Sequence, residues 1–336
     1  MTNCLLAIET SCDDTSAAVL CNGKVLSNVV ASQLEHESWG GVVPELAARA
    51  HLANIEMVVK EALKQADVSL QIVSAIAFTQ GPGLLGSLLI GSSFAKSLAL
   101  GLGIPLMAVN HMEAHILAHF IDEPRPEFPF LCLTVSGGHT QLVVVNNYNQ
   151  MEVIGETLDD AVGEAFDKIG KMMGLGFPAG YKIDKLAHQG NPLAFSFPIY
   201  EVGELNFSFS GIKTAFLYFV RDKSMEWIEA NLADLCASIQ HTLVGLLMKK
   251  VLKAMEKTGL HQLAIAGGVS ANMGLRKRLE DEAQKRNWKV FVPDFQYCTD
   301  NAGMVAMAAW FKFQHKEFAG LQAAPNPRLK IGEVQA

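Results

Sequence analysis

The sequence has little of what would place it in several common classes of protein. Only 18% of its 336 residues are charged and only 12 are proline, which excludes a disordered or a collagen-like chain. Its six cysteines include no CxxC pair and do not predict a disulfide scaffold, so we expect buried free thiols in a reducing cytosol. Half of the residues are hydrophobic, which is enough for two domains with cores of their own.

A long uninterrupted hydrophobic run is also missing. The longest apolar stretch, residues 84–109, is broken by Lys96, by glycines and by Pro105, whereas a membrane helix needs about 20 consecutive apolar residues. The residues before Glu9 include no basic region of the kind that opens a signal peptide. We therefore expect a cytoplasmic protein without a membrane-spanning segment.

The chain has no excess of positive charge. Its 27 Lys and Arg against 34 Asp and Glu give a net charge of −7, which excludes a protein that binds nucleic acid over its whole surface. The charge is unevenly distributed, because residues 249–289 hold ten basic and four acidic side chains. A solvated helix face is the default explanation of such a run, and contact with phosphates is the alternative.

Two parts of the sequence repeat one order of strands and turns. Residues 5–30 and 130–154 each predict three strands, in which the first strand ends in a polar turn and an asparagine turn joins the other two. Farther along, each part is followed by a strand that enters a glycine loop and a helix, at residues 80–83 and 267–270. The amides of such a loop and the positive end of the helix dipole suit an anionic ligand.

This duplication predicts an α/β protein of two related domains that face each other across a cleft. It resembles the actin, sugar-kinase and Hsp70 ATPase superfamily, whose hairpin turns hold phosphates between two lobes, and this resemblance implies a nucleotide-like ligand. We expect an N-terminal actin-like lobe at residues 1–125, with a helix at 302–320 packed back on it. A C-terminal actin-like lobe would span residues 126–300, with a tail at 321–336.

Two histidines have the spacing of metal ligands. His111 and His115 are four residues apart, so one face of a helix would present both to a divalent metal. A metalloprotease of the HExxH type would need a glutamate where this chain has Met112, which disfavours a peptidase. The leading third ligand is Asp300, although it could instead cap the last long helix. Two imidazoles and one carboxylate suit iron(II) or zinc.

Nine short motifs together resemble those of the TsaD (formerly Gcp) family, the tRNA adenosine threonylcarbamoyltransferases. They occur in that family's order and span nearly the whole chain. The motifs are ETSCDDT at 9–15, GGVVPE at 40–45, GPGL at 81–84, HMEAH at 111–115, SGGHT at 136–140, GEAFDK at 163–168, FSFSG at 207–211, AGGVSAN at 266–272 and CTDN at 298–301. The chain departs from the family at Ala179-Gly180-Tyr181, where the usual reading is Gly-Gly-Pro.

The resemblance implies a metal-dependent acyltransferase of tRNA modification. The threonylcarbamoyl group of threonylcarbamoyl-adenylate would pass to the exocyclic amine of adenosine 37, in tRNAs that read codons beginning with adenine, and AMP would be released. One divalent metal per subunit, iron(II) rather than zinc, would be bound by His111, His115 and Asp300. No residue of the chain is assigned as a general base.

The resemblance also implies the residues that bind the substrate. The hairpin turn would line it, Asp167 would accept a hydrogen bond from a ribose hydroxyl, and three further residues would complete the pocket. Asp167 and Asp184 could instead be solvated helix charges, Gly180 a helix start, and Asn272 a polar residue of a first helical turn. The full predicted set is Thr134, Val135, Ser136, Gly137, Gly138, Asp167, Gly180, Asp184 and Asn272.

The partners implied by the resemblance are tRNA, a smaller TsaB-like paralogue and a TsaE-like ATPase, with a homodimer when the chain is alone. A helix at residues 42–66 could dock the paralogue or simply pack on its own domain. Residues 249–289 would be the first candidate for contact with tRNA phosphates. Two other functions stay open: a small-molecule kinase or ATPase of the same fold, and a non-catalytic scaffold subunit.

Overall fold

The computed structural model describes residues 3–33, 36 and 39–333, and the chain forms two compact units. The N-terminal unit comprises residues 1–125, 148–150 and 293–336, and the C-terminal unit comprises 126–147 and 151–292. The division differs from the predicted boundary at residue 300, because the chain returns to the first unit at Pro293.

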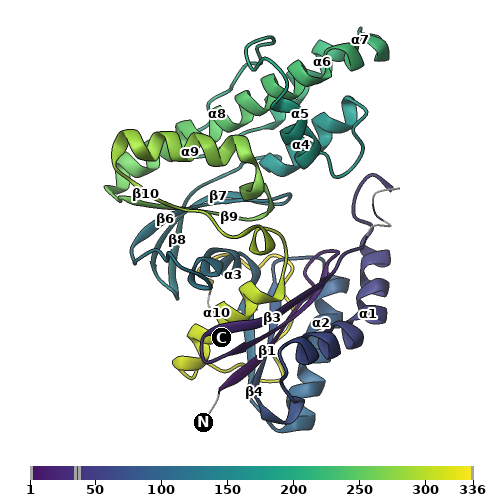
Figure 1. Ribbon diagram of the computed structural model, residues 1–336, viewed down its shortest axis with the longest axis vertical. Coiled ribbons are helices and arrows are strands. Elements are labelled where there is room, and N and C mark those ends of the chain that lie inside the picture. The colour runs from purple at the N-terminus through teal and green to yellow at the C-terminus, as the bar shows by residue number, and fades with distance from the viewer. Residues whose placement is uncertain (1–2, 34–35, 37–38, 334–336) are drawn as a thin grey trace. The chain divides into compact units, whose positions relative to one another are not determined.

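The sheet of the N-terminal unit has the strand order β3-β2-β1-β4-β5, and Figure 1 labels β3, β1 and β4 of it. Strand β1 pairs antiparallel with β2 and parallel with β4, and β4 pairs parallel with β5. The three inner strands are buried on both faces, which explains their nearly continuous apolar sequences. The strands are β1 (Cys4–Glu9), β2 (Thr15–Cys21), β3 (Lys24–Ala31), β4 (Val73–Gly81) and β5 (Leu106–Asn110).

Helices cover both faces of this sheet (Figure 1). Helices α1 and α2 pack on β2 and β4, and α10 packs on β1 and β2 with α3 beside it. Helix α10 is held at its start, where the N–H groups of Ala302 and Gly303 donate to Ser16 Oγ and Asn28 Oδ1. The helices are α1 (Pro44–Gln65), η2 (Leu70–Ile72), α2 (Leu85–Leu102), α3 (His111–Leu117), η3 (Ala118–Phe120), η5 (Phe295–Tyr297) and α10 (Ala302–Gln314).

The C-terminal unit repeats this topology. Its sheet has the order β10-β9-β6-β7-β8, with β6 antiparallel to β7 and parallel to β9, and β9 parallel to β10. Read from β8 to β10, the arrangement matches that of the first sheet strand for strand, which confirms the predicted duplicated α/β fold. The strands are β6 (Phe130–Val135), β7 (Thr140–Asn147), β8 (Gln150–Glu156), β9 (Gln262–Ala266) and β10 (Lys289–Phe291).

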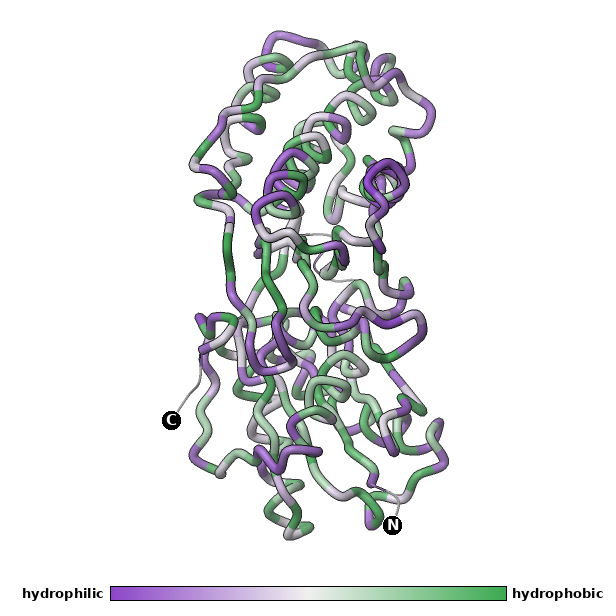
Figure 2. The backbone as a smooth tube through the Cα atoms, turned by 90° about the vertical axis from the view of Figure 1, so that its left-hand side faces the viewer, coloured by the Kyte–Doolittle hydropathy of each residue, from purple (hydrophilic) through white to green (hydrophobic). Residues whose placement is uncertain are grey.

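The C-terminal unit is built around one long helix, α8, which packs against α5 and α9. Two helices of the chain, α2 and α8, are long and apolar enough to cross a membrane by length and composition alone. In α8, 78% of this apolar stretch is buried inside the protein, so α8 is the core helix of its unit. Hydrophilic residues recur along the whole backbone (Figure 2). The helices are α4 (Val162–Met172), α5 (Gly180–Ala187), α6 (Ser210–Val220), α7 (Met225–Ala230), α8 (Leu232–Thr258), η4 (Gly268–Ala271) and α9 (Met273–Arg286).

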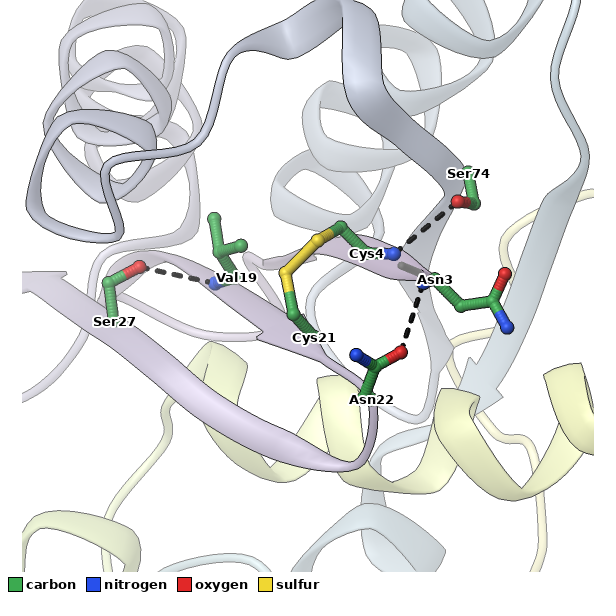
Figure 3. Close-up of a disulfide and its surroundings, with 7 residues drawn as sticks. All are labelled: Asn3, Cys4, Val19, Cys21, Asn22, Ser27 and Ser74. Atoms are coloured by element: carbon green, nitrogen blue, oxygen red, sulfur yellow. Dashed lines mark hydrogen bonds between the residues drawn. A yellow bond between two sulfur atoms is a disulfide. The ribbon is translucent and has the colours of Figure 1, made fainter. Parts of the chain in front are cut away.

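A disulfide joins Cys4 to Cys21, so the prediction that the cysteines are free thiols is wrong for this pair (Figure 3). The two residues are direct partners in the antiparallel register of β1 and β2, with Cα atoms 4.1 Å apart. Their separation of 17 residues follows no cysteine motif, so only the register of the strands reveals the pair. The other four cysteines are not in a disulfide, namely Cys12, Cys132, Cys236 and Cys298.

Candidate functional site

Helix α3 presents two histidines at one end of the N-terminal sheet. It begins at His111, directly after β5, and Asn110 caps it by accepting hydrogen bonds from the N–H groups of Met112 and Glu113. The four-residue spacing places His111 and His115 on one face, with ring centroids 4.7 Å apart. Both side chains are buried, so each must find its polar partners inside the protein.

Asp300 brings a carboxylate to both histidines. Its Oδ1 lies 3.4 Å from His111 Nε2 and 3.2 Å from His115 Nε2. The N-cap of α10 is the next residue, Asn301, whose Oδ1 accepts a hydrogen bond from the N–H of Met304. The alternative role predicted for Asp300, as the cap of the last long helix, therefore belongs to its neighbour.

The proximity of these charges changes the pKa of each group. Burial opposes the charged form of His111, but Asp300 and Glu9 outweigh burial and raise the pKa of His111 to about 10. Burial dominates at His115 and lowers its pKa. Burial alone would raise the pKa of Asp300, but the two histidines hold it well below its usual range. The carboxylate is therefore ionised and ready to bind a cation.

The three side chains fit a divalent metal. Their ligand atoms lie within 4.8 Å of one another, and two imidazole nitrogens with one carboxylate oxygen form a donor set that suits iron(II) or zinc. Both Nε2 atoms lie near the same carboxylate oxygen, so the three donor atoms form one compact group. Three protein ligands leave coordination positions for a substrate.

Glu9, to which the sequence motifs gave no role, lies beside this group. Glu9 ends β1 and is fully buried, with Oε2 3.1 Å from His111 Nδ1. Burial alone would raise the pKa of Glu9. The charge and hydrogen bond of His111 outweigh burial, so the net shift of this pKa is downward. One signal was available, because an acidic residue at the carboxyl end of an otherwise apolar inner strand lies where α/β sheets hold their ligands.

The turn between β6 and β7 is open to a ligand. The N–H of Ser136 donates to the carbonyl of His139 over 2.8 Å, and the Ser136 hydroxyl accepts hydrogen bonds from the N–H groups of Gly138 and His139. Gly137 and Gly138 are exposed, and a Cβ atom on either would meet nothing within 4 Å. The turn is therefore rigid and leaves space above its backbone.

Two neighbouring elements approach this turn. Thr134 and Val135 are buried in β6, so their side chains serve the core, and Gly267 lies against the end of that strand. A Cβ on Gly267 would lie 2.5 Å from the Val135 carbonyl oxygen, and its φ of +90° suits only glycine. At the start of α4, a Cβ on Gly163 would lie 2.6 Å from the carbonyl oxygen of Ser136. The predicted turn, the glycine loop and a helix N-terminus thus meet within one unit.

Asp167 joins two helices of the C-terminal unit. From α4, its Oδ1 accepts hydrogen bonds from the N–H groups of Ala179 and Gly180, at 2.7 and 3.2 Å, and so holds the first turn of α5. Burial raises the pKa of Asp167. Its Oδ2 makes no hydrogen bond with any residue that the structure describes, so this oxygen remains available to a ligand.

Asp184 and Asn272 hold the start of α9. Asp184 accepts hydrogen bonds from the N–H groups of Met273 and Gly274, at 2.9 and 3.3 Å. Asn272 is the N-cap of α9, and its Nδ2 donates to Gln240 Oε1 over 2.8 Å. Both side chains are committed to the fold, and a direct contact with a nucleotide stays a prediction for them.

Several solved structures share this fold. The HypF protein of T. kodakarensis matches with a TM-score of 0.65 at 13% identity, covering 96% of this chain and 50% of that one. Component A of the (R)-2-hydroxyglutaryl-CoA dehydratase of Acidaminococcus fermentans matches with a TM-score of 0.52 at 12% identity, covering 92% of this chain and 97% of that one. Identities this low show a shared fold and nothing of the activity.

Sequence comparisons identify the family. The family model of TsaD, tRNA N6-adenosine threonylcarbamoyltransferase, matches residues 24–307. A relative of that name in Christiangramia forsetii is 59% identical over 97% of this chain and 98% of its own length. Another in Cytophaga hutchinsonii is 55% identical over 98% of this chain and 96% of its own length. The chain therefore belongs to the TsaD family of tRNA N6-adenosine threonylcarbamoyltransferases.

Proposed function

We propose that this protein transfers the threonylcarbamoyl group of threonylcarbamoyl-adenylate to N6 of adenosine 37, in tRNAs that read codons beginning with adenine. The bond from the carbamoyl carbon to N6 forms, the bond from that carbon to the phosphate oxygen breaks, and AMP and a proton leave. The observation that carries this proposal is the 59% identity with a tRNA N6-adenosine threonylcarbamoyltransferase over nearly the full length of both chains.

We propose that the reaction depends on a metal bound by His111, His115 and Asp300, with iron(II) favoured over zinc. Two imidazoles and one carboxylate are the ligand set of non-haem iron(II) sites that keep positions open. When bound, the metal would supply a Lewis acid that polarises the carbonyl of the donor. The low pKa of Asp300 supports this role, because its carboxylate is charged at neutral pH.

The C-terminal unit would bind the adenylate part of the donor. The exposed turn of Gly137 and Gly138 offers backbone N–H groups to a phosphate, and the adjoining N-terminus of α4 adds the positive end of its dipole. The uncommitted Oδ2 of Asp167 would accept a hydrogen bond from a ribose hydroxyl. Asp184 and Asn272 would act by fixing the start of α9.

A TsaB-like paralogue would dock on α1 and α2, and a TsaE-like ATPase would join that assembly. Five large apolar side chains on these two helices are exposed although the helices pack against each other. Water-exposed apolar patches on otherwise well-packed helices commonly bind another protein. The same face would form the homodimer when the chain is alone. The five side chains are Leu52, Met57, Leu85, Leu89 and Leu100.

The tRNA would bind through cations of the C-terminal unit, in the cytoplasm, where tRNA is modified and read. Much of the basic segment at 249–289 is paired with acids, since Glu201, Glu204 and Glu282 each contact one or more of its Lys and Arg. A second lysine-lined surface is a pocket of about 520 Å³ on α4 and α6, where Asp160 pairs with Lys168 and Lys213 and only Lys171 has no ion pair among the described residues. Its lining residues are Lys168, Lys171, Met172 and Lys213.

The test is to supply threonylcarbamoyl-adenylate, a tRNA that reads codons beginning with adenine and the two partner proteins, and to measure the modified nucleoside by mass spectrometry. We expect product from the wild-type chain and loss of product and of bound metal together in His115→Ala. Full activity of metal-free His115→Ala would contradict the metal assignment. Phosphorylation of a metabolite by ATP, without modified tRNA, would instead favour a small-molecule kinase, and activity of the partners alone would favour a scaffold.

A further inference from the structure

We propose that Glu9 is a positioning residue of the metal centre: its carboxylate accepts a hydrogen bond from His111 Nδ1 and so fixes this imidazole with Nε2 directed at the metal. The inference rests on the proposed metal dependence. Glu9, at the carboxyl end of β1, would thus take part in metal binding, a role that the ETSCDDT motif alone does not reveal.

The two nitrogens of His111 face two different carboxylates. Nδ1 lies 3.1 Å from Glu9 Oε2 and 3.2 Å from Ser11 Oγ, and Nε2 lies 3.4 Å from Asp300 Oδ1. A neutral imidazole carries one N–H, and the nitrogen without it is the one that binds a metal. A carboxylate at Nδ1 retains the proton there, because it can only accept. When a metal displaces the second proton of His111, the lone pair is therefore on Nε2, on the side of Asp300.

Glu9 is itself held in place on both oxygens. Its Oε1 accepts a hydrogen bond from the N–H of Ser11, and its Oε2 accepts one from the Thr79 hydroxyl, each at 2.5 Å. The side chain is fully buried, so it has neither water nor open space in which to turn. A buried carboxylate with this many donors is costly to move and provides a rigid reference for the imidazole.

The topology explains why these residues meet. Glu9 ends β1, Thr79 lies near the end of β4, and His111 follows the last residue of β5. These three strands are parallel neighbours in the sheet, so their carboxyl ends lie at the same edge. The carboxylate, its anchoring hydroxyl and the metal ligand therefore come from three successive strands of one rigid element.

The second histidine lacks such a partner. The Nδ1 atom of His115 is buried and has no hydrogen-bond partner among the residues that the structure describes. Of the two imidazoles, only His111 has its Nδ1 beside a carboxylate among the residues that the structure describes. A purely structural role of Glu9, as the counter-ion of a protonated His111, predicts lower stability of a variant but no change in how a folded variant binds metal.

The experiment uses the full-length chain freed of metal, with Co²⁺ alone as the probe and no tRNA or donor present. Glu9→Gln keeps the size of the side chain and removes its charge. We expect Co²⁺ to bind about 10–100-fold more weakly, measured by competition with a chelator, with a changed visible absorption spectrum. The matched control is Glu113→Gln, a partly buried carboxylate on the helix of His111 that accepts a hydrogen bond from the N–H of Gly332, and it should bind Co²⁺ like the wild type.

A second variant keeps the proposal testable if Glu9→Gln does not fold, as judged by circular dichroism. Thr79→Val removes one anchor of Glu9 but leaves its charge, and we expect a smaller, several-fold loss of Co²⁺ affinity. A folded Glu9→Gln, or in its absence Thr79→Val, with wild-type affinity and spectrum would overturn the proposal. Failure of the wild-type chain to bind Co²⁺ would overturn the metal dependence as well, which distinguishes the two failures.

Discussion

At the scale of single residues, the loop after β1 places Asp13 and Asp14 close to other acidic side chains. Burial, chiefly, raises the pKa of Asp14 to about 7, and the charges of Asp13, Asp300 and Glu9 add to this effect, against a hydrogen bond from Ser32. A partly buried acid next to other acids retains its proton, because ionisation would add a like charge in a poorly solvated place. The loop therefore responds to pH in a definite direction.

We predict that the metal-free Asp14→Asn variant is more stable than the metal-free wild type, by a margin that grows as the pH rises. Between the ordinary pKa of an aspartate, about 4, and the folded value of about 7, the folded state binds the proton more tightly than the unfolded state. The free energy of unfolding of the wild type therefore falls as the pH rises through this range. That of the variant does not, because asparagine does not titrate. We expect a gain of about 1–3 kcal/mol at pH 8 that shrinks toward pH 5.

The measurement is the melting temperature of both proteins in chelator between pH 5 and pH 8. A constant difference between the two, or a variant that becomes relatively less stable as the pH rises, would contradict the raised pKa. Wild-type and variant curves that separate only above pH 5 would support it.

At the scale of elements, two glycines of one loop should differ sharply. We predict that Gly267→Ala destabilises the protein by about 2–4 kcal/mol, because its Cβ would lie 2.5 Å from a carbonyl oxygen and its φ is +90°. Gly268→Ala is the matched control, because a Cβ there meets nothing within 4 Å. Chemical denaturation of the two variants measures the difference, and equal stabilities would show that the loop relaxes away from β6.

Helix α1 has apolar residues that pack inside its own unit and other apolar residues that are exposed and available to a partner. The apolar positions that define its stripe in the sequence include Ile55, Val58 and Val59, and all three are buried against the sheet. Leu52 and Met57 are 67% and 65% exposed. A periodic pattern therefore predicts the helix and its inner face, whereas the outer apolar residues, which have no fixed period, emerge only from the structure.

We predict that Leu52→Glu with Met57→Glu abolishes binding of the TsaB-like paralogue while leaving the fold intact. A charge at the centre of an apolar interface must lose its water, which costs more than an interface of this kind provides. Co-elution of the purified proteins measures binding, and circular dichroism checks the fold. The matched control is Lys60→Glu on the same helix, whose ion pair with Glu56 is largely exposed and worth little. Undiminished co-elution of the double variant would place the paralogue elsewhere.

The sequence predicts the inner strands well because burial on both faces leaves long apolar runs. It misses β5 and β10, since strands of five and three residues are too short to show an alternating pattern of their own. The proposed metal ligands follow from a spacing and a motif, whereas the contact of Glu9 with His111 depends on which strands are neighbours. The disulfide likewise follows from the register of β1 and β2, which no local pattern determines.

At the scale of the whole molecule, the acidic total conceals cationic surfaces on one unit. We predict that Arg276→Glu with Arg278→Glu, and separately Lys171→Glu, weaken tRNA binding and flatten its dependence on salt. The slope of log affinity against log salt should fall by about 1 for each phosphate that the variant no longer neutralises. Affinity measured at several salt concentrations tests this, with Lys60→Glu as a control on the other unit. A surface whose variant binds tRNA with the wild-type slope does not touch the tRNA backbone.

The proposed sites would give each unit a different chemistry, because the proposed metal ligands belong to the N-terminal unit and the proposed adenylate-binding elements to the C-terminal unit. We predict that Asp300→Asn loses metal, and with it the rate of transfer, while the free chain still binds AMP. Asp167→Asn should keep its metal but bind AMP about tenfold more weakly, since its free oxygen would no longer offer a charged acceptor to the ribose. Metal analysis and calorimetry with AMP measure the two properties separately. If Asp300→Asn lost AMP binding as fully as metal, or if Asp167→Asn bound AMP normally, the two halves of the duplicated fold would not divide the work in this way.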